Sequence, residues 1–375
     1  MTSFDLARLR RFPDVEAANL FATDATDRLL LDTAADSLTA LAAGDLVVVG
    51  DRYGALTLGA ADRFGSTGIR TFQDPLSGEL ALAANAERFG LSQHYRSAAL
   101  AAGLFSGARV VLIQAPKSLD ALREIVELIA LDAPAEVEVY LGGRVKHLTH
   151  AVNGVLAAAF QDVTAGLARQ KSRVISARQL KGDPAPSSFP RQEWQADLEL
   201  FVCAHGGAFA GTKVDVGTRR LLGLLDRLAL HAAEAIDLGC GTGVLAAALA
   251  RSRPDIRVLA TDQSRAAVDS ARATMAANQL ADRVTVCRDD AMSTVADSST
   301  ELIVCNPPFH LDTTVHEGGS DKLFQAAGRV LRPGGELWTV HNAHLDYRPS
   351  LRSRVGKTEV VHRDPKFTVT VSRKS

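Results

Sequence analysis

The fold class of this 375-residue chain is indicated by the stretch Ala235-Ile236-Asp237-Leu238-Gly239-Cys240-Gly241-Thr242-Gly243. Its apolar start predicts a buried strand, and its three glycines predict a tight turn because glycine adopts positive φ angles without steric cost. The residues from Val244 to Arg251 predict a helix that ends before Pro254. A strand, a glycine turn and a helix in this order are typical of an α/β sheet that binds a ligand at the turn.

The rest of the C-terminal half continues this alternation. A helix is predicted from Ser264 to Asn278, and the remaining strands are predicted at residues 256–261, 283–288, 301–305, 336–340, 358–362 and 367–371. The last two of these flank a short turn, which predicts an antiparallel hairpin. The pattern therefore predicts a mostly parallel, seven-stranded, Rossmann-like α/β sheet with an antiparallel hairpin at one edge.

The N-terminal half resembles a degenerate copy of the same strand and helix pattern. A predicted strand ends at Gly50, and Gly50 lies 66 residues before Pro116, close to the 68 residues between Gly239 and Pro307. On this spacing the first copy keeps one glycine where the second has three. The sequence therefore predicts two tandem Rossmann-like domains, of which the first has kept the scaffold and lost the site.

The boundaries of these domains follow from a proline-rich stretch. Pro184, Pro186 and Pro190 lie within seven residues, which excludes regular helix or central strand. We expect a degenerate domain at residues 1–181, a linker at residues 182–196 and a domain with a complete site at residues 197–375.

Composition limits the compartment and the kind of site. The chain has no run of about 20 apolar residues that could span a membrane and no signal-peptide pattern at its start, so we expect a cytoplasmic protein. Its four cysteines include no Cys-x-x-Cys pair, so we expect no bound metal.

The net charge of −1 conceals two basic segments in an otherwise acidic chain. Residues 163–181 hold five basic and no acidic side chains, and residues 345–375 hold eight basic and three acidic ones. Either segment alone is typical of a solvated surface. Together they permit a polyanionic partner such as RNA, which the net charge alone disfavours.

Acidic residues at neighbouring strand ends indicate a nucleoside site. The turn Gly239-x-Gly241-x-Gly243 is one residue tighter than the fingerprint that binds a dinucleotide pyrophosphate. Asp262 ends the second predicted strand, where a carboxylate can accept both hydroxyls of a ribose. The third predicted strand ends in Asp289-Asp290, and one of these acids, which we take as Asp290, is expected where an adenine would lie.

The stretch Asn306-Pro307-Pro308-Phe309 follows the fourth predicted strand. Its prolines remove two N–H donors and hold the backbone extended, so the loop offers carbonyl oxygens and the Asn306 amide as acceptors. Converging acceptors suit an exocyclic amino group on a planar ring, and Phe309 can stack on that ring. This arrangement indicates chemistry at an amino nitrogen that requires no ionised base.

These motifs resemble those of class I S-adenosylmethionine-dependent methyltransferases that act on an amino nitrogen. Taken further, the chain is similar to the two-domain ribosomal RNA guanine-N2-methyltransferases, the RsmC/RlmG family, and the large-subunit rRNA branch fits better than the small-subunit branch. Further matching pieces are Val214–Thr218, Leu331–Leu337, Asn342–Tyr347, Ala115–Ser118 and Val145–His147. The stretch before about Ala43 departs from the family pattern.

The resemblance implies transfer of a methyl group from S-adenosylmethionine to the N2 of a guanosine in 23S rather than 16S rRNA. It implies that Asn306, Pro307, Pro308 and Phe309 hold the target base. It also implies a set of residues that bind the cofactor, namely Asp237, Gly239, Gly241, Gly243, Asp262 and Asp290. Phosphate contacts are expected from the basic segments, including Arg169, Lys171, Arg173, Arg178, Lys181 and Arg348 to Lys374.

Two alternative interpretations stay open at the level of sequence. The Asn-Pro-Pro motif with an aromatic residue also serves methyltransferases for adenine N6 and for protein glutamine, although their motif more often ends in tyrosine. A non-catalytic RNA-binding assembly factor is the other alternative, and the intact motifs of the second copy argue against it.

Overall fold

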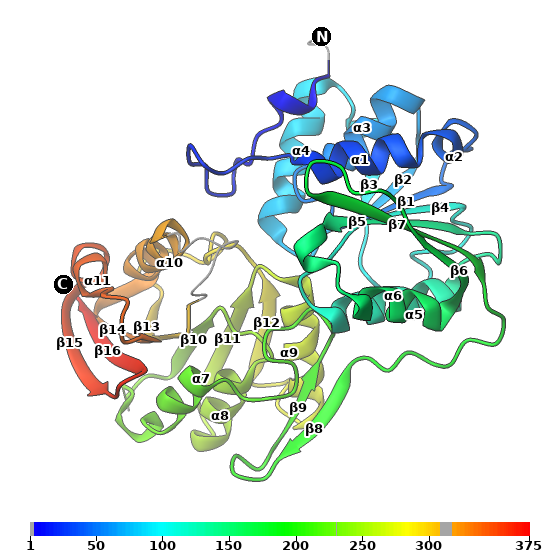
Figure 1. Cartoon of the computed structure of the whole chain (residues 1–375). Coiled ribbons are helices and arrows are strands. Elements are labelled where there is room, and N and C mark those ends of the chain that lie inside the picture. Colours follow the sequence, from blue (N-terminus) through cyan, green and yellow to red (C-terminus); the bar gives the residue numbers. More distant parts are fainter. Residues whose placement is uncertain (1–3, 230, 308–316) are drawn as a thin grey trace. The chain divides into compact units, whose positions relative to one another are not determined.

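The computed structural model describes residues 4–229, 231–307 and 317–375, and the chain divides into two compact units, Met1–Phe189 and Pro190–Ser375. Each unit contains one seven-stranded sheet, and the second adds a two-stranded hairpin. The predicted fold class is confirmed: both units are α/β and mostly parallel, with an antiparallel pair at one edge (Figure 1).

The first unit has the strand order β3-β2-β1-β4-β5-β7-β6, in which the pairs formed by β7 are antiparallel. Its strands are β1 (Leu46–Val49), β2 (Ile69–Phe72), β3 (Tyr95–Ser97), β4 (Val110–Gln114), β5 (Glu138–Arg144), β6 (Phe160–Ala165) and β7 (Ser172–Leu180). Its helices are α1 (Ala25–Thr33), α2 (Ala35–Thr39), α3 (Ala55–Phe64), α4 (Leu76–Phe89), α5 (Leu119–Asp132) and α6 (His150–Ala159), with 3₁₀ turns η1 (Leu6–Arg8), η2 (Ser92–His94) and η3 (Val145–His147).

The second unit has the equivalent order β12-β11-β10-β13-β14-β16-β15. Its strands are β10 (Glu234–Leu238), β11 (Arg257–Asp262), β12 (Val284–Arg288), β13 (Thr300–Cys305), β14 (Leu331–Asn342), β15 (Gly356–Arg363) and β16 (Phe367–Lys374), and its hairpin is β8 (Arg191–Gln195) with β9 (Leu200–Ala204). Its helices are α7 (Val216–Leu222), α8 (Val244–Ser252), α9 (Arg265–Ala277), α10 (Glu317–Val330) and α11 (Arg348–Arg354), with the 3₁₀ turn η4 (Leu225–Arg227). Strand β8 falls inside the stretch predicted as a linker.

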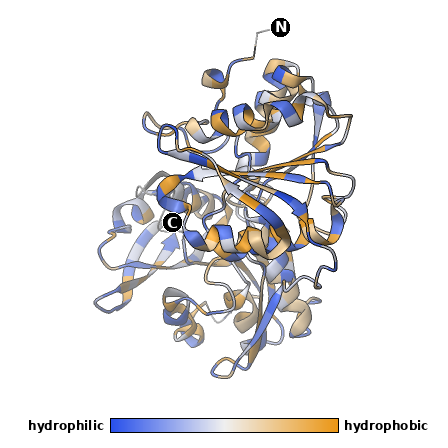
Figure 2. Ribbon diagram, turned by 45° about the vertical axis from the view of Figure 1, so that its right-hand side comes forward, coloured by the Kyte–Doolittle hydropathy of each residue, from blue (hydrophilic) through white to orange (hydrophobic). Residues whose placement is uncertain are grey.

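Apolar side chains fill both faces of each sheet. In the second unit one cluster joins β10, β13 and β14 to α8 and α9, and the other joins the opposite face to α10 and α11. In the first unit α5 and α6 cover one face, while α1, α2 and α3 cover the other. Hydrophobic residues therefore alternate with hydrophilic ones along the covering helices (Figure 2), as expected for helices with one buried face.

The strand registers align the two units residue by residue. Val49 pairs with Ile113 at the end of β1, as Leu238 pairs with Cys305 at the end of β10, and a glycine follows each strand. By this alignment Gln114 takes the place of Asn306. The predicted equivalence of Pro116 and Pro307 is wrong by one residue, because the strand register places Ala115 at the position equivalent to Pro307.

The same alignment corrects the predicted loss of glycines in the first copy. Gly54 lies just before α3 as Gly243 lies just before α8, and both have positive φ angles, 103° and 79°. Arg52, with φ 60°, takes the left-handed position that Gly241 holds with φ 53°. The first copy thus keeps two glycines and the backbone path of the turn, but carries a side chain where the second copy has none.

Candidate active site

The glycine turn between β10 and α8 leaves room for a ligand at two positions and packs tightly at the third. Gly239, Gly241 and Gly243 all have positive φ angles, of 74°, 53° and 79°. A Cβ added at Gly239 or Gly241 would meet no atom within 4 Å, whereas one at Gly243 would lie 2.8 Å from Met275 Cε. The first two glycines therefore keep the main chain accessible, and the third lets α8 pack against α9.

Asp237 stands on β10 beneath this turn, with only 1% of its surface exposed. Its Oδ2 accepts a hydrogen bond from the backbone N–H of Ala246 at 3.0 Å, while its Oδ1 has no partner among the described residues. Burial, reinforced by the nearby charge of Asp262, raises the pKa of Asp237 to about 7. A buried acceptor without a partner beside an open turn fits a ligand that brings its own donor or positive charge.

Asp262 ends β11 and fixes the shape of the turn. Its Oδ2 accepts the N–H of Gly241 at 3.0 Å, and its Oδ1 accepts the N–H of Ser264 at 2.9 Å. The predicted ribose-binding residue thus also holds the glycine turn.

The structure distinguishes the two acids that follow β12. Asp289 is buried and accepts hydrogen bonds from the backbone N–H and hydroxyl groups of Ser293 and Thr294. Burial alone would raise its pKa, but these bonds hold the pKa below the ordinary value. Asp289 therefore caps a turn, and Asp290 is left as the candidate for ligand binding.

Asp290 has a partner that the sequence did not indicate. Its Oδ2 lies 2.5 Å from the Lys322 ammonium of α10, and its side chain is 14% exposed. A donor from a bound adenine would share this carboxylate with Lys322.

Asn306 follows β13, and its side chain is held in one orientation. Its amide nitrogen donates to Asp215 Oδ2 at 3.0 Å and to Thr218 Oγ1 at 3.1 Å. Its Oδ1 is buried and has no hydrogen-bond partner among the described residues. Since the nitrogen is engaged on one side, the free lone pairs of Oδ1 are available to an amino group.

Asp215 and Thr218 are the partners of Asn306 that sequence reasoning missed. Asp215 caps α7 by accepting the N–H groups of Gly217 at 2.8 Å and Thr218 at 3.3 Å, with the same Oδ2 atom that binds Asn306. The segment Val214–Thr218 is one of the pieces that carry the family resemblance, but nothing in its spacing links it to Asn306, which lies 91 residues after Asp215.

The other residues of the predicted substrate loop are only partly described. Pro307 is buried directly after Asn306. The predicted contributions of Pro308 and Phe309 lie outside the described residues.

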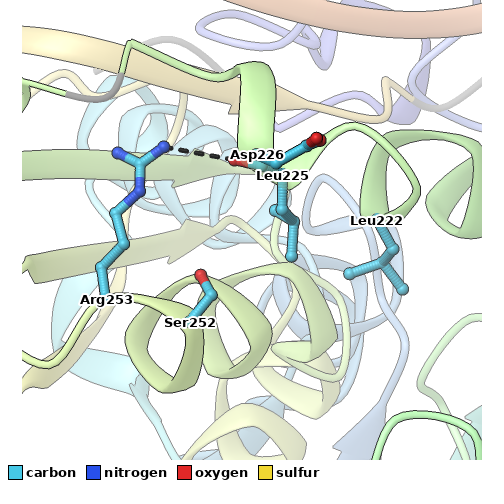
Figure 3. A pocket seen from close by; sticks show the side chains of 5 residues that line it. All are labelled: Leu222, Leu225, Asp226, Ser252 and Arg253. Atoms are coloured by element: carbon cyan, nitrogen blue, oxygen red, sulfur yellow. Dashed lines mark hydrogen bonds between the residues drawn. The ribbon is translucent and has the colours of Figure 1, made fainter.

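A surface pocket of about 400 Å³ lies elsewhere on the second unit, lined by Leu222, Leu225, Asp226, Ser252 and Arg253 (Figure 3). Ser252 and Arg253 stand at the C-terminal end of α8, one helix length from the glycine turn at its N-terminal end. The Arg253 guanidinium is engaged by backbone carbonyls, including that of Leu225 at 3.3 Å. This pocket is therefore separate from the residues described above.

Two features are absent from the described residues. None of their helices is both long and apolar enough to cross a membrane. Within the same residues there is no group of three or more His, Cys, Asp or Glu side chains placed to hold a metal ion.

Comparison with known proteins gives matches over both units. The family model described as "Methyltransferase small domain" matches residues 199–371, and the one described as "RLMG N-terminal domain" matches residues 1–181. The chain is 32% identical to ribosomal RNA large subunit methyltransferase G of Shewanella amazonensis over 96% of this chain and 94% of that protein. It is 35% identical to the protein of the same name from Streptomyces coelicolor, over 96% of each.

One solved structure is similar over nearly the whole chain. It is the T. thermophilus 16S rRNA N2 G1207 methyltransferase (RsmC) in complex with AdoMet and guanosine, with a TM-score of 0.73, 22% identity and coverage of 94% of this chain and 92% of that one. At this identity the likeness establishes the shared two-unit fold.

Proposed function

This chain belongs to the ribosomal RNA large subunit methyltransferase G family and is an S-adenosylmethionine-dependent rRNA methyltransferase, and we propose that its target is the exocyclic N2 of a guanosine in large-subunit rRNA. The observation that carries this proposal is the Asn306 side chain, whose nitrogen is held by Asp215 and Thr218 and whose buried oxygen has no partner. An amide oriented in this way accepts a hydrogen bond from an amine.

The residues of the glycine turn fit the cofactor. The open space at Gly239 and Gly241 and the unpartnered Oδ1 of Asp237 suit the methionine end, where an ammonium group would supply the missing donor. Asp262 would hold the ribose hydroxyls and Asp290 the adenine amino group. When bound, S-adenosylmethionine supplies a methyl group on a positively charged sulfur.

The substrate loop would act by positioning. Asn306 Oδ1 and the Pro307 carbonyl would accept the two hydrogens of the guanine amino group and so direct its lone pair toward the methyl group, while Pro308 and Phe309 would hold the ring. Asn306 is a neutral amide and takes no proton, so its contribution is orientation. As the N–C bond formed and the S–C bond broke, the sulfur would leave as the thioether of S-adenosylhomocysteine and the proton lost by the amine would pass to solvent. Positioning of this kind supplies up to about 7–11 kcal/mol in well-oriented reactions.

The proposal extends to the first unit and to the compartment. Residues 1–181 would serve as a scaffold for RNA recognition, because Arg52 places a side chain at the position where Gly241 leaves room for the cofactor. The cytoplasm, where rRNA is made and assembled in bacteria, is the proposed compartment.

The test is methylation of an unmodified large-subunit rRNA transcript by the purified protein and its Asn306→Ala variant. We expect N2-methylguanosine from the wild type, at least 100-fold less from the variant, and an S-adenosylmethionine Kd within about threefold of the wild type. Nucleoside mass spectrometry identifies the product. N6-methyladenosine in place of N2-methylguanosine would contradict the proposal, and so would a variant that loses cofactor binding as well as activity.

A further inference from the structure

Two loops of the first unit come together at the carboxyl end of β5. Arg144, the last residue of β5, pairs with Ser172 at the start of β7, and the N–H of Val145 donates to the Lys171 carbonyl at 2.9 Å. A tight turn, closed by reciprocal 2.8 Å bonds between Arg169 and Ser172, precedes β7 (Figure 1). We call the exposed side chains of these loops the basic tip, which comprises Arg144, Lys146, His147, Arg169 and Lys171.

The basic tip lies in the most positively charged stretch of the first unit. Residues 139–182 contain seven Lys or Arg side chains and a single acidic one, Asp162. Asp162 lies on β6 and pairs with Arg178 across the sheet, away from the tip. The sequence does not reveal this cluster of positive charge directly. Its first part lies in the acidic segment before residue 163, and its second part lies in the basic segment at residues 163–181.

Three of the lysine and arginine side chains of the basic tip make no ion pair within the described residues. They are Lys146, Arg169 and Lys171, and all three are exposed. Arg144 makes only a long contact, 3.8 Å from Asp24, and its side chain is 51% exposed. Clustered like charges repel one another, and within the described part of the unit no acidic side chain is placed among these three to offset the repulsion.

Within the basic segment at residues 163–181, two side chains of the predicted phosphate-binding set have partners inside the unit. Arg178 pairs with Glu138 at 3.1 Å and donates to the Tyr140 hydroxyl at 2.9 Å. The Lys181 ammonium donates to the Ala157 carbonyl at 2.5 Å. These two side chains stabilise the sheet and the helix that covers it, and Arg173 on β7 is only partly exposed. The exposed basic side chains of this segment with neither an ion pair nor a hydrogen bond within the described residues are therefore those of the turn, Arg169 and Lys171.

The catalytic unit has a lysine at the equivalent place. Its Ala343 N–H donates to the Lys366 carbonyl at 2.8 Å, just as Val145 donates to Lys171, and Asn342 pairs with Phe367 as Arg144 pairs with Ser172. Phe367 lies beside Gly217, which also adjoins Asn306 Oδ1. In the second unit, the position equivalent to the basic tip therefore lies close to Asn306 Oδ1, the proposed acceptor for the target amine.

We infer that the basic tip is a docking surface for the phosphate backbone of rRNA. The inference rests on the proposed function, which makes RNA the substrate, and it adds the surface of the first unit that binds the substrate. Exposed lysine and arginine side chains without counter-charges release condensed counterions from a polyanion, which gives salt-dependent affinity without reading sequence. A base that leaves its stack for the active site costs a few kcal/mol, and such contacts offset that cost.

The test compares two variants of the full chain that lose the same charge. The tip variant is K146Q/R169Q/K171Q, and the control variant is R8Q/R96Q/R109Q, whose arginines are exposed on the same unit outside the tip. Binding to an unmodified large-subunit rRNA transcript is measured between 0.05 and 0.3 M salt. Because each phosphate contact contributes about 0.7–0.9 to the slope of log K against log[salt], the tip variant should lose about 2–3 in slope and about 100-fold in affinity near 0.1 M salt.

Three further measurements keep the outcomes distinct. A charge-preserving variant, K146R/R169K/K171R, should bind as the wild type does, and S-adenosylmethionine binding should be unchanged in every variant, which shows that the second unit remains folded. Tip and control variants with equal slopes would overturn the inference. Failure of the wild type to methylate the transcript would overturn the proposed function instead, since the binding comparison does not depend on methyl transfer.

Discussion

Replacing Asp215 by Ala should slow methyl transfer without weakening cofactor binding. The Asp215 carboxylate accepts a hydrogen bond from the Asn306 amide nitrogen at 3.0 Å, and this bond sets which side of the amide presents the free oxygen. A hydrogen bond to a charged group contributes about 1.5–3 kcal/mol, and about 1.4 kcal/mol corresponds to a tenfold change in rate. We therefore expect kcat/KM for rRNA to fall about 10- to 150-fold in an assay of methyl incorporation from labelled S-adenosylmethionine.

Asp215 also caps α7, so the effect on catalysis has to be separated from an effect on stability. Loss of an N-cap costs about 1 kcal/mol in the free energy of unfolding. Asp215→Ser keeps a side-chain oxygen for the N–H groups of Gly217 and Thr218 but is one bond shorter toward Asn306. If the Asp215–Asn306 bond orients the amide, the Ser variant should be as stable as the wild type and as slow as the Ala variant.

The conservative variant Thr218→Val removes the second partner of Asn306, at 3.1 Å, and leaves the cap in place. A neutral hydrogen bond contributes about 0.5–1.5 kcal/mol, so kcat/KM should fall about 2- to 13-fold. A Ser variant of Asp215 with wild-type kcat/KM would refute the reasoning. So would a loss in all three variants that is explained entirely by a weaker Kd for S-adenosylmethionine.

Three further predictions concern the cofactor side of the site. Asp262→Ala removes the acceptor for the Gly241 N–H, and calorimetry should show the S-adenosylmethionine Kd rising by about 10- to 150-fold; an unchanged Kd would exclude a role in binding. Gly241→Ala and Gly243→Ala both place a side chain at a positive φ angle, but only Gly243→Ala also sets a methyl group 2.8 Å from Met275 Cε. Gly243→Ala should therefore lower the free energy of unfolding by about 1–3 kcal/mol more than Gly241→Ala does, and Gly241→Ala should also weaken cofactor binding; equal losses of stability in urea would contradict this difference. Burial raises the pKa of Asp237 to about 7, above the ordinary value of about 4, so the cofactor-free folded state holds a proton that the unfolded chain has already lost. The free energy of unfolding should therefore fall as pH rises from about 4 to 7, and Asp237→Asn should flatten this dependence; an unchanged slope would show that other groups cause it.

The sequence predicted the fold well because the deciding signals are local. A buried strand followed by glycines and a helix describes β10, its turn and α8 within 20 residues, and both sheets repeat that pattern. The positions of Asp237 and Asp262 followed from strand ends, which the hydrophobic pattern locates. Local signals were sufficient wherever a residue's role depends on the element that carries it.

The remaining features depend on side-chain partners or on backbone angles, which the pattern does not contain. Counting glycines missed that Arg52 adopts the left-handed conformation of Gly241, because a non-glycine residue at positive φ has no distinct spacing. The family resemblance named Asp290, but the strand pattern alone does not separate the adjacent acids Asp289 and Asp290, and their different partners do. The bond from Asn306 to Asp215 joins segments 91 residues apart, which only the closed sheet brings together.

The amide–carboxylate contact occurs in both copies, and this separates what the scaffold needs from what the reaction needs. In the first unit the Gln114 amide donates to Asp27 of α1, as Asn306 donates to Asp215 of α7, and burial raises the pKa of Asp27 to about 6. In the first unit Arg52 occupies the position at which Gly241 leaves open space in the second unit. The amide–carboxylate contact is therefore present even in the unit whose turn carries a side chain at this position. In both units the contact therefore attaches a helix to the carboxyl end of the fourth strand in the sheet order. These elements are α1 and β4 in the first unit, and α7 and β13 in the second. In the second unit the same attachment leaves Oδ1 of Asn306 buried and without a partner among the described residues, so the proposed orientation of the target amine would follow from a contact that both copies contain.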